Sequence, residues 1–134
     1  MRIVVAGGVY FLLVFASGFV RGAIRVTFVA PAVGALGATF IELPVMLAIS
    51  WWVARRLVAI CEVRNKAGDR LAMGGVAFAL LMAAEMALGM ALGRPLAVQW
   101  HDLFQPPGLV GLAGQIVFGL MPLAIMMQRR SSSE

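Results

Sequence analysis

Five polar side chains interrupt stretches of sequence that are otherwise apolar, and their types and spacing suggest a paired charge network. They are two arginines, two carboxylates and one amide: Arg21, Arg25, Glu42, Glu85 and Gln115. A charge inside a bilayer costs several kcal/mol, so such residues usually face protein or water and have partners. Arg21 lies about 10 Å inward from Phe28, and Glu42, Glu85 and Gln115 lie about 6 to 12 Å inward from the ends of their segments on the same side, at about 1.5 Å per residue. We therefore expect a buried Arg21/Arg25–Glu42/Glu85 network with Gln115 as a neutral hydrogen-bond partner.

Two of these residues have simpler interpretations. Arg25 can extend its side chain to the outer lipid headgroups without any acidic partner. Glu42 forms a Thr-x-x-Glu pattern with Thr39, which is typical of a capping box at a helix start, although a helix that begins nearer Pro44 is an alternative. Pairing also leaves the role of the network open, because a structural clasp and a proton or cation pathway use the same residue types.

The elements that must position these side chains are four apolar stretches. A bilayer core about 30 Å thick requires about 20 helical residues. The chain of 134 residues is 62% hydrophobic and 13% charged, and its apolar stretches have no polar stripe of useful width. This predicts an all-α, four-helix integral membrane bundle with a disordered tail over residues 128–134 and helices at about Ile3–Ala30, Ala38–Ala54, Leu71–Gly93 and Gly108–Met127.

The basic residues predict the orientation of these helices. If the chain crosses the membrane four times, eight basic residues lie on one side and Arg94 lies on the other. The eight are Arg2, Arg55, Arg56, Arg64, Lys66, Arg70, Arg129 and Arg130. Cytoplasmic loops carry an excess of Lys and Arg, so we expect both termini in the cytoplasm. The strong preference for Arg over Lys is typical of a high-GC bacterial genome, which suggests the inner membrane. The net charge of +5 is explained by topology, so we expect no nucleic-acid partner.

The connections between the helices differ in character. Pro31–Gly37 is rich in Gly and Pro and predicts a tight hairpin between the first two segments. Arg94–Pro107 is either a short interfacial helix ended by Pro106 and Pro107 or an ordinary amphipathic loop.

Arg2 and the apolar run after it resemble a signal peptide, but the run continues to Ala30, which favours a retained helix.

Glycines at helical spacing indicate where the helices approach each other closely. Association of helices in lipid depends on small residues and polar contacts. We expect packing contacts at Gly18, Gly22, Gly89, Gly93, Gly111 and Gly114. A sixteen-residue match between Gly7–Gly22 and Gly74–Gly89 also leaves an internal duplication open.

Residues for catalysis or metal binding are sparse. His101 is the only histidine and Cys61 is the only cysteine, and the predicted topology places them on opposite sides of the membrane. The sequence has neither a GxxxxGK[ST] loop that would hold phosphates nor a G-x-S-x-G nucleophile turn. We therefore expect no enzymatic activity, no cofactor and no metal site.

One stretch resembles a known kind of protein. The segment runs GFVRGAIRVTFVAPAVGALGATFIELPVMLAISWWVAR, and the pattern lies in Gly18, Gly22, Arg25 and Val26, then Pro31 and Gly34, then Glu42, Pro44 and Met46. It is similar to small, uncharacterised bacterial membrane proteins with four transmembrane helices. The resemblance implies only that Arg25, Glu42 and Pro44 belong to one recurring arrangement.

Two functions agree with these features. The first is an interaction or accessory subunit, in which the charged network holds the bundle and the glycine faces contact a larger membrane protein or a second copy. The second is a small proton- or cation-coupled transporter or channel, in which Glu85 or Glu42 exchanges an ion against Arg21. We favour the first, because the chain is short and its intramembrane carboxylates are matched by arginines.

Overall fold

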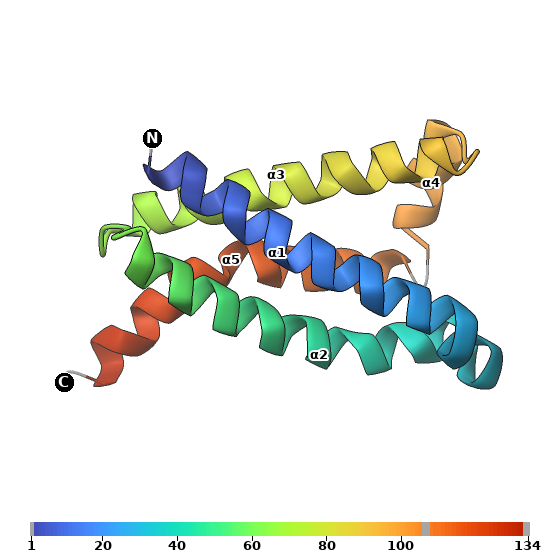
Figure 1. The fold of residues 1–134 in the computed structure, drawn as a ribbon, viewed down its shortest axis with the longest axis horizontal. Coiled ribbons are helices and arrows are strands. Elements are labelled where there is room, and N and C mark those ends of the chain that lie inside the picture. Colours follow the sequence, from blue (N-terminus) through green and yellow to red (C-terminus); the bar gives the residue numbers. More distant parts are fainter. Residues whose placement is uncertain (1, 106–107, 133–134) are drawn as a thin grey trace.

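Four long helices and one short helix make up the fold (Figure 1). The computed structural model describes residues 2–105 and 108–132, except for the side chains at positions 22, 23, 25, 26, 30 and 35. The elements are α1 (Arg2–Ile24), the π-helical segment η1 (Arg25–Val29), α2 (Ala30–Ile60), α3 (Ala67–Ala91), α4 (Leu96–Leu103) and α5 (Gly108–Ser132). The prediction of an all-helical protein with four long apolar helices is confirmed, since the helices are long and apolar enough to span a membrane by length and composition.

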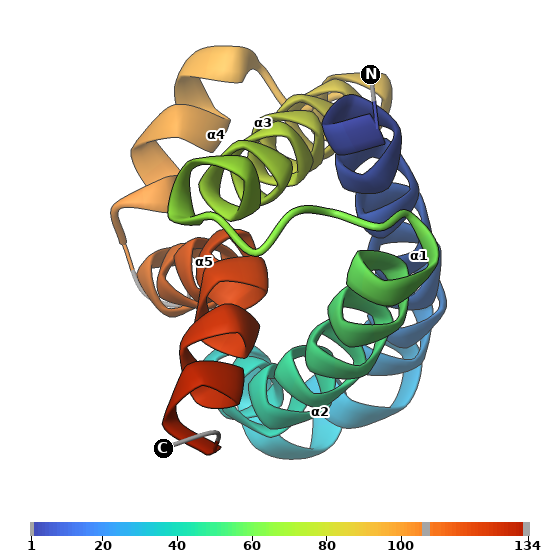
Figure 2. The same ribbon diagram turned by 90° about the vertical axis from the view of Figure 1, so that its left-hand side faces the viewer.

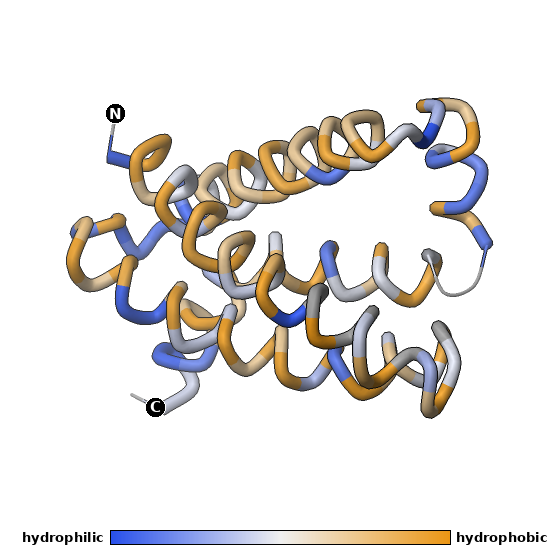
Figure 3. The backbone as a smooth tube through the Cα atoms, turned by 45° about the vertical axis from the view of Figure 1, so that its right-hand side comes forward, coloured by the Kyte–Doolittle hydropathy of each residue, from blue (hydrophilic) through white to orange (hydrophobic). Residues whose placement is uncertain are grey.

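The long helices form a four-membered ring in which each packs against two neighbours. α1 contacts α2 and α3, and α5 contacts the same two helices from the opposite corner (Figure 2). α1 and α3 run in one direction while α2 and α5 run in the other, so both chain ends and the α2–α3 link lie at one end (Figure 1). We call this end, which carries the eight basic residues named above, the basic end. Figure 3 shows the hydrophilic positions gathered mainly at the two ends of the bundle.

The reversal between α1 and α2 differs from the predicted turn at Pro31–Gly37. It begins earlier, at η1, where the backbone widens into a π-helix. Pro31 then occupies the first turn of α2, and the break falls at Gly34, whose φ of 81° lies in the left-handed region. Glycine adopts this conformation without a steric cost, so Gly34 rather than a proline redirects the chain. Thr39 is buried inside the apolar helix Leu36–Ile60, so neither a capping box at Thr39 nor a helix start near Pro44 is correct.

Two helices extend beyond their predicted ends. α2 continues to Ile60, so Arg55 and Arg56 are helical rather than part of a link. α5 continues to Ser132, so the prediction of a disordered tail is wrong for residues 128–132. Residues 133 and 134 lie outside the described part of the chain.

The outer connection contains a helix, which decides between the two alternatives left by the sequence. α4 exposes the apolar side chains of Leu96, Val98 and Trp100 and buries the amide of Gln99. The Gln99 amide donates to the carbonyl oxygens of Met86 (3.3 Å) and Arg94 (3.1 Å), which holds α4 against the end of α3. The predicted stop at Pro106–Pro107 lies outside the described residues.

Candidate functional site

Arg21 and Glu42 form an ion pair between α1 and α2. The Arg21 Nη1 lies 3.5 Å from the Glu42 Oε1, and the two side chains are only 15% and 22% exposed. Arg21 also donates from Nη2 to the Ser17 hydroxyl at 3.3 Å, and Ser17 donates in turn to the Val14 carbonyl at 2.9 Å. The Arg21 guanidinium, in the last turns of α1, therefore contacts one carboxylate from α2 and one hydroxyl from α1.

Glu85 and Gln115 form a second pair, between α3 and α5. The Gln115 amide donates to the Glu85 Oε2, and Gln115 is buried. Glu85 itself is exposed, which differs from the predicted buried position. Whether a side chain faces the interior depends on the rotation of its helix, and the weak amphipathicity of α3 gives no sequence signal for that rotation.

The structure describes two separate pairs among these residues, on opposite sides of the ring, rather than one joined network. One lies in the α1–α2 interface and the other in the α3–α5 interface. The Arg25 side chain is outside the described part of the structure, so its predicted contacts are not described. The ion pair in one interface and the hydrogen bond in the other can each hold neighbouring helices together, and an exposed carboxylate can also exchange a proton or cation.

Only some of the predicted packing glycines lie at close helix contacts. A Cβ at Gly114 would collide with Leu43 of α2, and one at Gly89 would collide with the Gln99 side chain. Gly111 has open space around it, Gly18 lies near only the Arg21 side chain of its own helix, and Gly93 serves a turn with a φ of 85°. Gly22 is among the positions whose side chains are not described.

The tightest helix approach was not predicted. A Cβ at Gly74 of α3 would collide with the carbonyl oxygen of Gly119 in α5, and one at Gly7 of α1 would lie 2.8 Å from the Met73 carbonyl oxygen. The sequence carries a signal for these contacts in the repeated Gly-Gly-Val at Gly7 and Gly74. Gly7 of α1 therefore allows the close approach to α3, and Gly74 of α3 allows the close approach to α5.

A tyrosine crosses the centre of the ring to a carbonyl that a proline leaves unbonded. Pro122 has no N–H, so the carbonyl of Phe118, four residues earlier, lacks its usual helical donor. The hydroxyl of Tyr10 in α1 donates to that oxygen at 2.8 Å, and the rings of Tyr10 and Phe118 stack at 4.3 Å. Both side chains are fully buried. Sequence reasoning missed this contact, although the position of Pro122 identifies the unbonded carbonyl.

Arg70, one of the eight residues of the basic end, is another buried polar residue. It is only 2% exposed. Its guanidinium donates to the carbonyl oxygens of Arg64 (3.1 Å), Pro122 (3.4 Å) and Val63 (3.5 Å). Arg70 therefore joins the α2–α3 link to α5 at Pro122.

Potential metal ligands do not gather in the described residues 2–105 and 108–132, where no three His, Cys, Asp or Glu side chains form a candidate site. His101 is exposed on α4, and Cys61 is half-buried at the end of α2.

The fold defines the class as a small all-helical protein whose four apolar helices are compatible with a multi-pass membrane protein. Comparison with known proteins finds no matching family model, no matching curated protein and no matching solved structure.

Proposed function

We propose that the protein is a non-enzymatic accessory subunit of a membrane assembly in the bacterial inner membrane, with both chain ends in the cytoplasm. The orientation is supported by the basic end, where eight Lys and Arg residues stand against two described acidic residues, Glu62 and Asp69. Basic residues near helix ends favour the cytoplasmic side. The resemblance to small bacterial proteins with four transmembrane helices agrees with this location.

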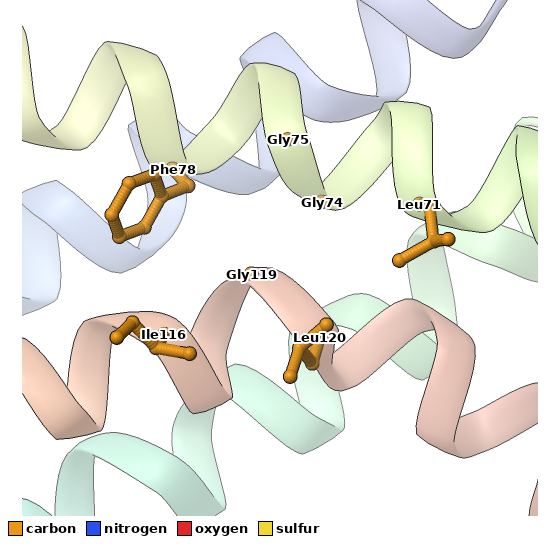
Figure 4. Close-up of a pocket in the computed structure, with 7 residues that line it drawn as sticks. All are labelled: Leu71, Gly74, Gly75, Phe78, Ile116, Gly119 and Leu120. Atoms are coloured by element: carbon orange, nitrogen blue, oxygen red, sulfur yellow. The ribbon is translucent and has the colours of Figure 1, made fainter.

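The observation that carries the proposal is an apolar groove on the outside of the bundle. It lies between α3 and α5, measures about 200 Å³, and has a floor of small residues, Gly74, Gly75 and Gly119 (Figure 4). Its walls are the side chains of Leu71, Phe78, Ile116 and Leu120. Transmembrane helices associate through such small-residue surfaces, where a partner's side chain can approach the backbone. We expect the occupant to be an apolar helix of a larger membrane protein.

The polar pairs support the same proposal. Arg21–Glu42 and Glu85–Gln115 each join two helices of this chain, so they strengthen the bundle that presents the groove. Large apolar side chains also cover the outside of the long helices, including Phe19, Phe40 and Leu120. A rigid bundle with an apolar exterior and one glycine-lined groove is suited to binding a helix within the membrane.

Filling the groove tests this function. Gly75 lines the groove and a Cβ there would meet no atom within 4 Å, so Gly75→Leu should fill the groove without disturbing the fold. Gly8 on α1 has equally open space and lies outside the groove, which makes Gly8→Leu the matched control. We expect particles purified from the native membrane in mild detergent to contain a second polypeptide at fixed stoichiometry. Gly75→Leu should lose it and Gly8→Leu should keep it.

Two results would contradict the accessory role. One is a wild-type particle whose mass corresponds to this chain alone or to copies of it. The other is equal retention of the second polypeptide by Gly75→Leu and Gly8→Leu, which would remove the groove from the interface.

A small proton- or cation-coupled transporter is the second candidate, because of the position of Glu85. This carboxylate is exposed although it lies six residues, or about 9 Å, from the end of α3. A carboxylate that is reachable at this depth is typical of ion pathways. In proteoliposomes, a carrier should lose proton or cation flux on Glu85→Gln and stay folded, with Glu62→Gln in the α2–α3 link as the control. Loss of stability without any wild-type flux would assign Glu85 a structural role.

A further inference from the structure

A second cavity lies at the basic end, away from the groove and from both polar pairs. It measures about 380 Å³ and opens between α2 and α5, where it is lined by Arg55, Ile125, Gln128, Arg129 and Ser132. Arg55 comes from α2 and the other four residues come from the last two turns of α5. The cavity therefore combines two guanidinium groups and an amide with one apolar side chain, Ile125.

In the part of the chain that the structure describes, neighbouring carboxylates do not neutralise the two arginines of this cavity. Among the described residues, the acidic side chains at this end pair elsewhere, Glu62 with Arg2 at 3.1 Å and Asp69 with Arg64 at 3.5 Å. Within the same part of the chain, neither Arg55 nor Arg129 has a carboxylate at ion-pair distance. Two like charges that face one cavity repel each other, so the site favours an anion between them.

We infer that this cavity binds the phosphate group of an anionic phospholipid. The planar guanidinium groups of Arg55 and Arg129 match phosphate oxygens in a bidentate geometry, and the Gln128 amide offers a further donor. Basic pockets between transmembrane helices on the cytoplasmic side are suited to lipid headgroups. Ile125 is 1% exposed and forms an apolar wall, which suits a ligand that joins a phosphate to a hydrocarbon chain.

The depth of the cavity agrees with a headgroup. Arg55 lies five residues before the end of α2 and Arg129 three before the end of α5, which is about 5 to 8 Å from the helix ends. Trp51 and Trp52 lie one turn deeper on α2, at the level where aromatic side chains mark the membrane interface. A free phosphate ion offers the same chemistry, so the test must separate the two sources.

A matched pair of double variants distinguishes a site from general attraction to basic residues. Arg55→Gln/Arg129→Gln removes two charges from the cavity. Arg56→Gln/Arg130→Gln removes two charges from adjacent positions on the same helices that do not line it. Each protein is inserted into nanodiscs of phosphatidylcholine, and insertion and mass are checked before binding is measured. Phosphatidylglycerol is then titrated and bound lipid is counted by native mass spectrometry, with inorganic phosphate in a parallel titration.

We expect the cavity double variant to bind phosphatidylglycerol more weakly by about tenfold for each arginine lost, and the adjacent double variant to bind like the wild type. Arg55→Lys/Arg129→Lys keeps both charges but loses the planar guanidinium groups, so its affinity for phosphatidylglycerol should lie between those of the two glutamine double variants. This variant also tests the site if the glutamine variant of the cavity fails to fold. Equal losses in both double variants, or none in either, would overturn the site. If the cavity binds inorganic phosphate but not phosphatidylglycerol, its ligand is a free phosphate ion and the inference of a lipid is wrong. This inference and the proposed accessory role both require that the protein inserts into a membrane, and insertion is checked before binding is measured.

Discussion

The hydrogen bond from Tyr10 to the Phe118 carbonyl gives the sharpest prediction for the stability of the bundle. Tyr10→Phe removes only the hydroxyl and keeps the ring that stacks on Phe118 at 4.3 Å. The carbonyl oxygen then has no donor, because Pro122 cannot supply the N–H that a helix normally provides. Both side chains are fully buried, so water cannot easily replace the bond.

The expected cost follows from the burial of this carbonyl. A buried acceptor without a partner costs about 1 to 3 kcal/mol in proteins generally, while hydrogen bonds between membrane helices average about 0.6 kcal/mol and reach about 1.7. We expect Tyr10→Phe to lower the free energy of unfolding by about 1 to 2 kcal/mol. In a Pro122→Ala background, residue 122 regains its N–H and can bond to the Phe118 carbonyl. The same Tyr10→Phe change should then cost almost nothing.

A double-mutant cycle on these two positions tests the reasoning. The unfolding free energy of each protein is measured in mild detergent by titration with a denaturing detergent, followed by far-UV circular dichroism and tryptophan fluorescence. The coupling energy between the two changes should be about 1 to 2 kcal/mol. If Tyr10→Phe costs the same with and without Pro122, the carbonyl does not depend on the tyrosine and the argument is wrong.

Three other changes have outcomes that follow from the contacts. Gly74→Ala should destabilise the bundle by about 2 kcal/mol or more, because its Cβ would collide with α5. Gly75→Ala has open space around the new Cβ and should be neutral. Similar unfolding free energies for the two variants would refute the close contact. Arg21→Gln should cost about 1 to 2 kcal/mol in the wild type and less when Glu42 is also glutamine, and additive effects in that cycle would show that the 3.5 Å pair is not coupled. Gly34→Ala should cost about 1 kcal/mol, since alanine is strained at a φ of 81°, and an unchanged melting temperature would contradict this.

The helices could be predicted from the sequence because their length and apolar composition are local properties. The four predicted segments correspond to the four long helices, with differences mainly at their ends. The continuation of α2 through Arg55 and Arg56 was missed because arginine is a good helix former and need not end a helix. The break at Gly34 was missed because Pro31 suits the first turn of a helix as well as a turn between helices.

The candidate site could be predicted only where depth along a helix decides the contact. The structure brings together Arg21 and Glu42, which have opposite charges and similar predicted depths. The exposure of Glu85 and the close contact at Gly74 depend instead on how each helix is rotated against its neighbours. The burial of Arg70 depends on carbonyl oxygens of the α2–α3 link and α5, which no pattern of side chains reveals.

The contact between Tyr10 and Phe118 also bears on how the protein is made. The two residues are separated by 108 positions, so Tyr10 leaves the ribosome long before its acceptor is synthesised. Until α5 has been synthesised, the Phe118 carbonyl that accepts from the Tyr10 hydroxyl is absent, and α2 and α3 lack one of the two neighbours that they share. A nascent chain that stops after α3 therefore lacks the helix that closes the ring and the Phe118 side chain that stacks on Tyr10.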